Sequence, residues 1–423
     1  MRDFLTLPEA ARLRLVNATV PGCLVGEEAD LVRRDLAMAG DRIVADDGTG
    51  AVVDLRGAIL FPAFVDMHTH LDKGHIWPRT PNPDGTFMGA LNAAMADSSA
   101  RWTAEDLRTR IGFGLRTAYA HGTRAIRTHL DTWMPQIDVS WPVFADIRAE
   151  WAGRIALQAA ALLGCDMVEP GGDFRRMADL LADHGGVLGL FTFPMPDLDA
   201  RLRTFFRLAA ERGMMADFHA DETLDPQVNT LRQIALAALE TGFSASVVAG
   251  HTCSLSTMPE REALETLDLC AKAGIAIVGL PMCNIYLQDR QAGRTPRNRG
   301  VTLVHEMKAR GISVSFASDN TRDPFYAYGD LDMIEVMREA TRICHLDHAD
   351  PDWSRAFLAN PAAVCGMEAP SLAPGAPADL VICRARDWSE LFARPQADRV
   401  VIRAGRQIDR TLPDYAELDP LME

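Results

Sequence analysis

The sequence is poor in lysine and in long apolar runs, and each shortage excludes a class of protein. Lysine occurs three times, and acidic residues outnumber basic ones 58 to 43, which gives a net charge of −15. A chain of this charge lacks the basic surface that attracts nucleic acids and anionic membranes. No apolar run approaches the ~20 residues of a membrane span, and the N-terminal segment lacks the apolar stretch of a signal peptide. We therefore expect a cytoplasmic protein with no nucleic-acid or membrane partner.

Paired cysteines are also missing. The eight cysteines are scattered along the chain, and none forms a Cys-x-x-Cys pair. This pattern indicates neither a disulfide framework nor a zinc ribbon. We expect buried free thiols in a reducing compartment.

The two ends of the chain differ in pattern from its middle. With 423 residues and 48% hydrophobic content, the chain is too long for one ordinary domain unless it is a barrel with appendages. Short alternating segments near both ends predict a small β-sandwich built from the N- and C-terminal parts. These segments are Arg14–Val20, Leu31–Ala37, Arg42–Ala45, Val52–Arg56, Ala378–Arg384 and Arg399–Arg403. The predicted division is residues 1–57, a central domain of residues 58–365, and residues 366–423.

In the middle, short apolar runs alternate with helical stretches such as Ala104–His121 and Asp199–Gly213. Eight such units predict an α/β fold of the (β/α)₈ TIM-like barrel type. The predicted strands are Ala58–Val65, Thr123–Arg127, Arg154–Ala161, Gly186–Phe193, Met215–His219, Ala245–Gly250, Ile275–Leu280 and Ile312–Ala317.

Polar residues gather where these predicted strands end. In such a barrel the chemistry lies at the carboxyl ends of the strands. In His68-Thr69-His70, the two histidines alternate and so project to one side. Five of the 11 histidines occupy strand ends, namely His68, His70, His129, His219 and His251. This concentration indicates a site.

The residue types in this group suit a metal ion. Three neutral imidazoles and one carboxylate are good ligands for Zn²⁺ or Fe²⁺. We predict that His68, His70, His219 and Asp319 bind one divalent metal ion. The metal would lower the pKa of a bound water toward ~7 and so provide hydroxide at neutral pH.

Two further residues are candidates for proton transfer. Glu222 lies three residues after His219, close enough to carry a proton from the water to a leaving nitrogen. His251 could hold the hydroxide or polarise the substrate, and Asp319 could also accept a proton. The alternatives are that Glu222 is a solvated loop acid and that His251 is a core histidine bonded to a carbonyl.

Three other residues stay undecided at this stage. His129 and Asp131 fit either residues that orient the ligands or ordinary packing. Lys73 follows the His-Thr-His stretch, and it could pair with an acid such as Asp72 or Asp323, or touch the substrate.

Taken together, motifs over residues 55–405 resemble the amidohydrolase superfamily, and within it the cytosine deaminase-like group. The matching stretches are FVDMHTHLD (64–72), GTRAIRTHLD (122–131), DFHADE (217–222), AGHT (249–252), NIYLQDR (284–290), SDNTRDPFYAYG (318–329) and APGAPADLVI (373–382). The resemblance implies the same four ligands, with Glu222 as proton shuttle and His251 orienting the hydroxide. Binuclear members bridge their metals with a lysine on a middle strand. No lysine lies on predicted strands three to five, which favours one metal ion.

The chain departs from the cytosine deaminase pattern at four positions. Gly164 takes the place of a glutamine that reads the pyrimidine edge, and Asn320 that of an aspartate. Phe325 replaces a tryptophan and Phe87 a leucine. A site built for one polar edge rejects analogues without it, so these changes argue against cytosine. We predict a larger or differently edged ring, such as a pterin, an aminopurine-like base or an isocytosine-type ring, with Phe87 and Phe325 stacking on it.

The predicted function is therefore a metal-dependent hydrolytic deaminase of an amino-substituted N-heterocycle. Metal-bound hydroxide would attack the amino-bearing ring carbon, and ammonia would leave. One alternative is an amidohydrolase that cleaves another carbon–nitrogen bond, in an N-alkylamino group or a cyclic amide. Another is an inactive barrel acting as a binding or scaffold protein. The expected partner is a small-molecule aminoheterocycle, and a homo-oligomer is left open.

Overall fold

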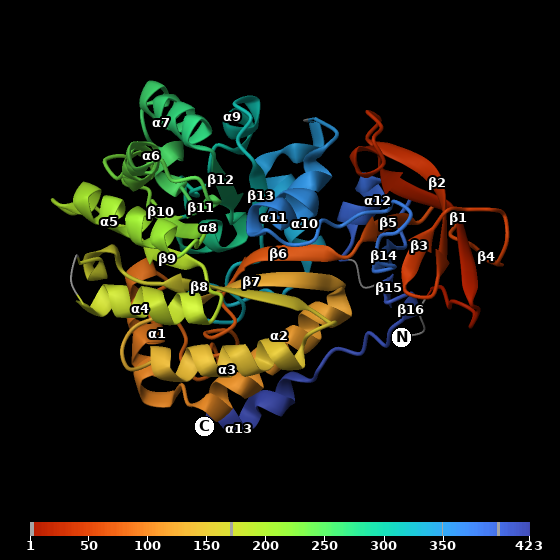
Figure 1. Ribbon diagram of the computed structural model, residues 1–423, viewed down its shortest axis with the longest axis horizontal. Coiled ribbons are helices and arrows are strands. Elements are labelled where there is room, and N and C mark those ends of the chain that lie inside the picture. Colours follow the sequence, from red (N-terminus) through yellow and green to blue (C-terminus); the bar gives the residue numbers. More distant parts are fainter. Residues whose placement is uncertain (1–3, 170–171, 349, 396–397) are drawn as a thin grey trace.

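The strands in the middle of the chain pair in parallel and close a barrel (Figure 1). The structure is a computed structural model that describes residues 4–169, 172–348, 350–395 and 398–423. One sheet contains β6 (Phe64–Thr69), β7 (Thr123–Asp131) and β8 (Ala156–Leu162). The other contains β9 (Leu188–Phe191), β10 (Ala216–Ala220), β11 (Val247–His251), β12 (Ile275–Gly279) and β13 (Val314–Phe316).

Isolated bridges join the two sheets at both edges. The parallel bridges Ala160 to Val187 and Gly164 to Phe191 connect β8 with β9. On the other edge, Thr69 bridges Asp319, just past β13. The predicted barrel of eight parallel strands is therefore present in the structure.

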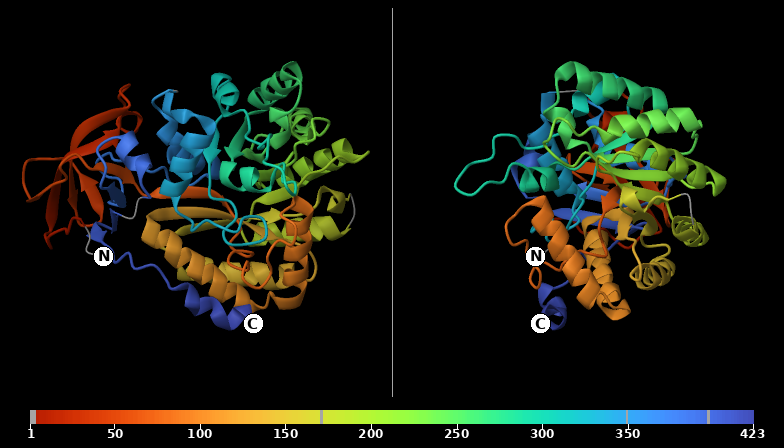
Figure 2. Two further views of the ribbon diagram at one scale, coloured as in Figure 1. Left: turned by 180° about the vertical axis from the view of Figure 1, so that it is seen from behind. Right: turned by 90° about the vertical axis from the view of Figure 1, so that its left-hand side faces the viewer.

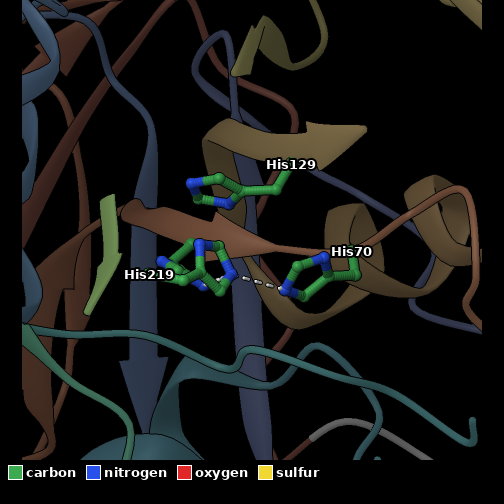
Figure 3. A group of neighbouring side chains, drawn as sticks. His70, His129 and His219 are labelled. Atoms are coloured by element: carbon green, nitrogen blue, oxygen red, sulfur yellow. Dashed lines mark hydrogen bonds between the residues drawn. The ribbon is translucent and has the colours of Figure 1, made fainter. Parts of the chain in front are cut away.

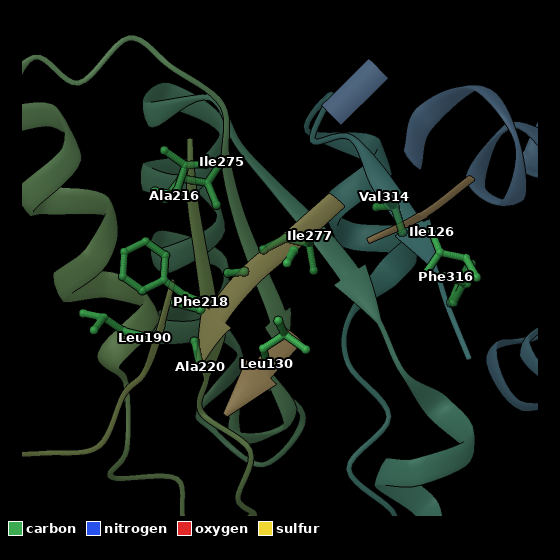
Figure 4. Packing of buried hydrophobic residues seen from close by; sticks show 14 of the residues in the cluster. Ile126, Leu130, Leu190, Ala216, Phe218, Ala220, Ile275, Ile277, Val314 and Phe316 are labelled. Atoms are coloured by element: carbon green, nitrogen blue, oxygen red, sulfur yellow. The ribbon is translucent and has the colours of Figure 1, made fainter. Parts of the chain in front are cut away.

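The barrel strands are buried on both faces, which explains their continuous apolar runs. Every residue of β12 is buried, and so is every residue of β10. Figure 4 shows side chains from several strands, among them Phe218 and Ile277, in one core. Phe205 of α5 packs against Phe218 with ring centroids 4.9 Å apart, so helices cover the outside of the barrel.

The helices follow the strands in the order typical of βα units. They are α1 (Phe87–Arg101), α2 (Ala104–His121), α3 (Ile137–Glu150), α4 (Gly172–Asp183), α5 (Leu198–Glu211), α6 (Thr230–Thr241), α7 (Glu260–Ala273), α8 (Pro281–Leu287), α9 (Val304–Ala309), α10 (Met333–Cys344), α11 (Ala359–Cys365), α12 (Trp388–Ala393) and α13 (Asp419–Met422). Helix α2 has the predicted bounds because Thr103 caps its start and Gly122, with φ 98°, ends it.

The two ends of the chain share one sheet beside the barrel (Figures 1 and 2). Its strands are β1 (Arg12–Pro21), β2 (Leu31–Ala39), β3 (Arg42–Val44), β4 (Ala51–Asp54), β5 (Ile59–Pro62), β14 (Leu380–Cys383), β15 (Arg399–Arg403) and β16 (Arg406–Gln407). Strand β5 lies between β14 and β1, which joins the C-terminal strands to the N-terminal ones. That this sheet forms a sandwich, and that the domains divide at residues 57 and 365, stay predictions.

The predicted strand Ala58–Val65 is wrong, because this run contains two strands. Strand β5 pairs with β14 in the terminal sheet, whereas β6 begins the barrel at Phe64. Both strands are fully buried, so the apolar run continues across the change of sheet and periodicity cannot reveal it.

The predicted end of the next strand at Arg127 is wrong as well, since β7 continues to Asp131. The residues that lie within strands rather than after them, contrary to the prediction, are His68 in β6, His129 and Asp131 in β7, and His251 in β11.

Two predictions based on composition can be compared with the described residues. All eight cysteines are free, seven of them are buried, and Cys23 is half-buried. In the part of the chain that the structure describes, no helix has the length and apolar character needed to cross a membrane.

Candidate active site

Three imidazoles and one carboxylate converge at the carboxyl end of the barrel. The Nε2 atom of His219 lies 3.1 Å from Nε2 of His68 and 3.3 Å from Nε2 of His70. Asp319 Oδ1 lies 3.5 Å and 3.3 Å from the same two nitrogens. Figure 3 shows His70 and His219 turned toward one another. Ligand atoms that are ~2.1 Å from a tetrahedral zinc ion lie roughly 3.4 Å apart, so this spacing fits one metal ion.

The protonation states of this cluster also fit a metal ion. Burial lowers the pKa of His68, His70 and His219 well below the ordinary histidine value, which keeps the imidazoles neutral, as ligands must be. Both carboxylate oxygens of Asp319 are buried and have no hydrogen-bond partner among the residues that the structure describes, and burial raises the pKa of Asp319 to about 8. A buried carboxylate without a partner is unfavourable, and a divalent cation would supply the missing partner.

The backbone fixes Asp319 against β6. Its N–H donates to the carbonyl of His68 at 2.8 Å, and its φ of 63° lies in the left-handed region that few non-glycine residues adopt. Such strain persists where the surroundings hold it and is common at functional sites. Gly250 of β11 leaves room for the imidazole of His68, because a Cβ at this position would lie 3.1 Å from Cε1 of His68.

Glu222 and His251 lie beside the metal-ligand cluster. The Glu222 side chain is 7% exposed, and its Oε1 lies 3.4 Å from His251 Nδ1. Burial, with the nearby Asp319, raises the pKa of Glu222 well above its usual range, whereas burial lowers that of His251 to about 3. Glu222 is therefore not a solvated loop acid.

His251 is oriented by Asn284 on α8. Asn284 Nδ2 lies 3.0 Å from His251 Nδ1. A donating amide makes Nδ1 the acceptor and leaves the ring proton on Nε2. That Nε2 is buried without a hydrogen-bond partner in the described structure, and His251 lies within one potential metal-binding group with His68 and Asp319. The proton on Nε2 is thus available to a group bound beside these side chains.

The loop that carries Glu222 is held by its neighbour Asp221. The carboxylate of Asp221 accepts hydrogen bonds from the backbone N–H of Thr230 at 2.7 Å and of Leu231 at 3.1 Å, at the start of α6. Its own carbonyl accepts from the N–H of Cys253 at 2.9 Å, just after β11. These contacts fix Glu222 between two βα connections.

His129 belongs to the same cluster of histidines. Figure 3 shows His129 beside His70 and His219. The His129 ring centroid lies 4.0 Å from that of His68, and its Nε2 lies 3.0 Å from Asp217 Oδ1. Asp217 also accepts from Arg127 at 2.9 Å. Sequence reasoning missed Asp217, although its position two residues before His219 on β10 puts both side chains on one side of the strand.

Lys73 pairs with an acid, which was one of the predicted alternatives, although the acid is neither of the two examples named. Its Nζ donates to Asp131 Oδ1 at 2.8 Å, rather than to Asp72 or Asp323. Asp72 accepts from the backbone N–H of Asp131 at 2.7 Å, and so belongs to the same buried group. Sequence reasoning could not identify this pair because it joins the segment after β6 to the end of β7.

The four residues proposed to contact substrate have identifiable neighbours. The rings of Phe87 and Phe325 lie 5.6 Å apart in a T-shaped arrangement, and Phe87 stacks on Phe191 at 5.9 Å. Gly164 forms a parallel β-bridge with Phe191, and so lies beside this group of aromatic rings. Asn320, next to Asp319, donates from Nδ2 to Asp323 at 2.8 Å.

Comparisons with known proteins agree with this arrangement. The profile of the amidohydrolase family matches residues 51–179 and 174–409. The chain belongs to the amidohydrolase family. It is 51% identical over 433 residues to a pterin deaminase of Rhizobium rhizogenes, a match that covers 99% of each chain. The family predicted from the motifs is thus confirmed.

Two further relatives are more distant. An N-isopropylammelide isopropyl amidohydrolase of Pseudomonas sp. is 25% identical over 318 residues, which cover 71% of this chain and 74% of that one. The crystal structure of 5-methylcytosine deaminase from Klebsiella pneumoniae with 5-fluorocytosine matches with a TM-score of 0.81 and 26% identity, over 95% of this chain and 98% of that one. The comparisons bear out the class of activity predicted for this chain, a metal-dependent deaminase of an amino-substituted heterocycle.

Proposed function

We propose that this enzyme hydrolyses the exocyclic amino group of a pterin and releases ammonia. The observation that carries the proposal is the 51% identity to a pterin deaminase across 99% of both chains. The departures from the cytosine deaminase pattern support it independently. Gly164 lacks the side chain expected to read a pyrimidine, and a two-ring pterin needs a larger pocket than cytosine.

We propose His68, His70, His219 and Asp319 as ligands of one Zn²⁺ or Fe²⁺ ion. The spacing of their ligand atoms and the unpartnered carboxylate of Asp319 support this assignment. A divalent ion bound there would act as a Lewis acid and lower the pKa of a water molecule toward neutrality.

Side chains of the protein would accept and donate the protons that the reaction transfers. Glu222 would take a proton from the attacking water and deliver it to the leaving nitrogen, because burial raises its pKa and so makes the carboxylate a stronger base for the proton it carries. His251 would donate from Nε2 to the developing negative charge, in the orientation that Asn284 sets. Asp319 would accept a proton through its buried carboxylate, beside the reacting water.

Aromatic and polar side chains at the same end of the barrel would bind the substrate ring. One of the two rings, Phe87 or Phe325, would stack on its flat face, and the other, which stands at 70° to the first, would contact its edge. Asn320 would form hydrogen bonds with the polar edge of the ring, since its amide offers a donor and an acceptor where the cytosine deaminase pattern has an aspartate. Gly164 would leave space beside Phe191.

The test is a substrate profile of metal-replete protein. Pterin, cytosine, isocytosine, adenine and guanine are compared by ammonia release, and the product is identified by mass. We expect pterin to have the highest kcat/KM. Glu222→Gln should keep its metal and lose about 10²- to 10⁴-fold in kcat. Cytosine as the best substrate, or no release of ammonia from pterin, would overturn the proposal.

A further inference from the structure

A basic loop stands out from this acidic chain. Residues 285–300, after the start of α8, contain four arginines and one aspartate, a net charge of +3, whereas the whole chain carries −15. In the right-hand view of Figure 2, a teal loop from this part of the chain projects from the barrel. Local charge of opposite sign to the rest of the molecule attracts anions specifically to this place.

The loop encloses a groove of about 220 Å³. Its lining includes Arg290, Arg294 and Arg299, together with Tyr286. Arg290 lies over the Tyr286 ring, 4.6 Å from the centroid. Three guanidinium groups around one small volume form a site for a carboxylate or a phosphate, because each group offers several N–H donors in one plane.

Two of these charges are uncompensated within the described residues. Arg290 donates to the carbonyl of Tyr286 at 2.6 Å, and Arg299 donates to the carbonyl of Ile285 at 2.8 Å. Neither forms an ion pair with a carboxylate anywhere in the described ranges. Carbonyl contacts hold a guanidinium in place without neutralising it, so both arginines keep donors and charge for a ligand.

Asp289 gives the loop a fixed shape. Its carboxylate pairs with Arg294 and accepts hydrogen bonds from the backbone N–H of Arg297 and, at 3.0 Å, of Asn298. The Asp289 carboxylate thus links the two sides of the loop. The arginines are therefore held by the loop rather than spread over a flexible surface.

The groove adjoins the proposed active site. Gln288 Nε2 donates to the carbonyl of Glu222 at 3.3 Å, and Gly300 at the other end of the loop packs beside Gln288. Tyr286 and Leu287 belong to the same apolar cluster as Phe87 and Phe325. A ligand that lies against this aromatic pair can thus extend a substituent past Tyr286 toward the arginines.

We propose that the arginine groove binds an anionic group on the substrate's side chain, so that the preferred substrates are pterins carrying a carboxylate or a phosphate. This inference rests on the proposed pterin deaminase activity and narrows its substrate class. The arginines would raise the association rate by long-range attraction and hold the anion by paired N–H···O contacts.

The experiment compares neutral and anionic pterins in wild type and variants. The substrates are pterin, 6-hydroxymethylpterin, pterin-6-carboxylate and the phosphate ester of 6-hydroxymethylpterin. We expect kcat/KM at low salt to be about tenfold higher for an anionic substrate than for its neutral counterpart. The advantage should shrink between about 20 mM and about 300 mM NaCl because screening shortens the range of the attraction.

The double variant Arg290→Gln/Arg299→Gln should bring the anionic-to-neutral ratio close to one and remove its salt dependence. Arg261→Gln is the matched control, since this arginine on α7 has a side chain that is 91% exposed. A preference for only one of the two anions identifies the group and supports the inference. The inference is overturned if neutral pterins are deaminated but the anionic-to-neutral ratio of kcat/KM is close to one in wild type. It is also overturned if the double variant keeps the wild-type ratio. Failure to deaminate any pterin overturns the proposed function and this inference with it.

Discussion

Lys73 Nζ donates to Asp131 Oδ1 at 2.8 Å, and each side chain is only 5% exposed. The pair joins the segment after β6 to the end of β7, next to the proposed metal ligands. Lys73 also lies 5.3 Å over the ring of Phe325. Burial would lower the pKa of Lys73, but Asp131 and Asp72 raise it, so the lysine stays charged.

Lys73→Met should therefore destabilise the fold. The substitution keeps most of the side-chain volume but leaves the Asp131 carboxylate buried without its cation, which in other proteins costs about 3 to 5 kcal/mol. We expect this loss in the free energy of unfolding, measured by urea denaturation. Lys73→Met/Asp131→Leu should recover part of it, since it removes both charges. A single variant as stable as wild type would contradict this account.

The convergence of the four proposed metal ligands could be predicted because barrel topology and residue type are both visible in the sequence. His68, His70, His219 and Asp319 follow apolar runs, and the carboxyl ends of barrel strands meet at one face. What could not be predicted depends on contacts between strands. The partner of Lys73, the pairing of His129 with Asp217, and the division of residues 58–65 between two sheets all require the register of distant segments.

Metal binding itself can be measured without substrate. We expect about one divalent ion per chain in wild type, and loss of that ion in His68→Ala and in Asp319→Asn, because each change removes one ligand of the proposed set. Elemental analysis after dialysis gives the content. His348→Ala serves as the control, since its side chain is 94% exposed. Retention of a full metal ion by both ligand variants would refute the assignment.

Gly250 should be required for the position of His68. In Gly250→Ala, the new Cβ would lie 3.1 Å from Cε1 of His68, closer than ordinary contacts, so the imidazole must shift by a few tenths of an ångström. We expect metal affinity to fall about 10-fold, as for changes that disturb the orientation of a ligand. Competition with a chelator measures the affinity.

The matched control for this change is Gly112→Ala in α2, where a Cβ meets nothing within 4 Å. It should keep wild-type metal affinity and add about 0.5 to 1 kcal/mol of stability, because alanine is the better helix residue. Equal metal affinity in the two alanine variants would show that His68 tolerates the added methyl group.

A salt bridge between the barrel and the terminal sheet should govern stability in acid. Asp332, at the start of α10, accepts a hydrogen bond at 2.7 Å from Nη1 of Arg399 on β15, and the Asp332 side chain is 13% exposed. Burial alone would raise the pKa of Asp332, but the charge of Arg399, with that of His121, holds it well below the ordinary value. The folded state thus favours the ionised carboxylate more strongly than the unfolded chain does.

The sign of the pH dependence follows from this difference. A depressed folded pKa contributes stability above the unfolded value of about 4, and that contribution is lost as the pH falls below it. Asp332→Asn should therefore be less stable than wild type by about 2 kcal/mol at pH 7, and the gap should narrow at pH 3.5. Urea unfolding at both pH values measures it. Asp398→Asn removes a 49% exposed partner of Arg384 and should change stability by less than about 1 kcal/mol at either pH. A gap between Asp332→Asn and wild type that is constant with pH would mean that the carboxylate charge does not hold the two parts together.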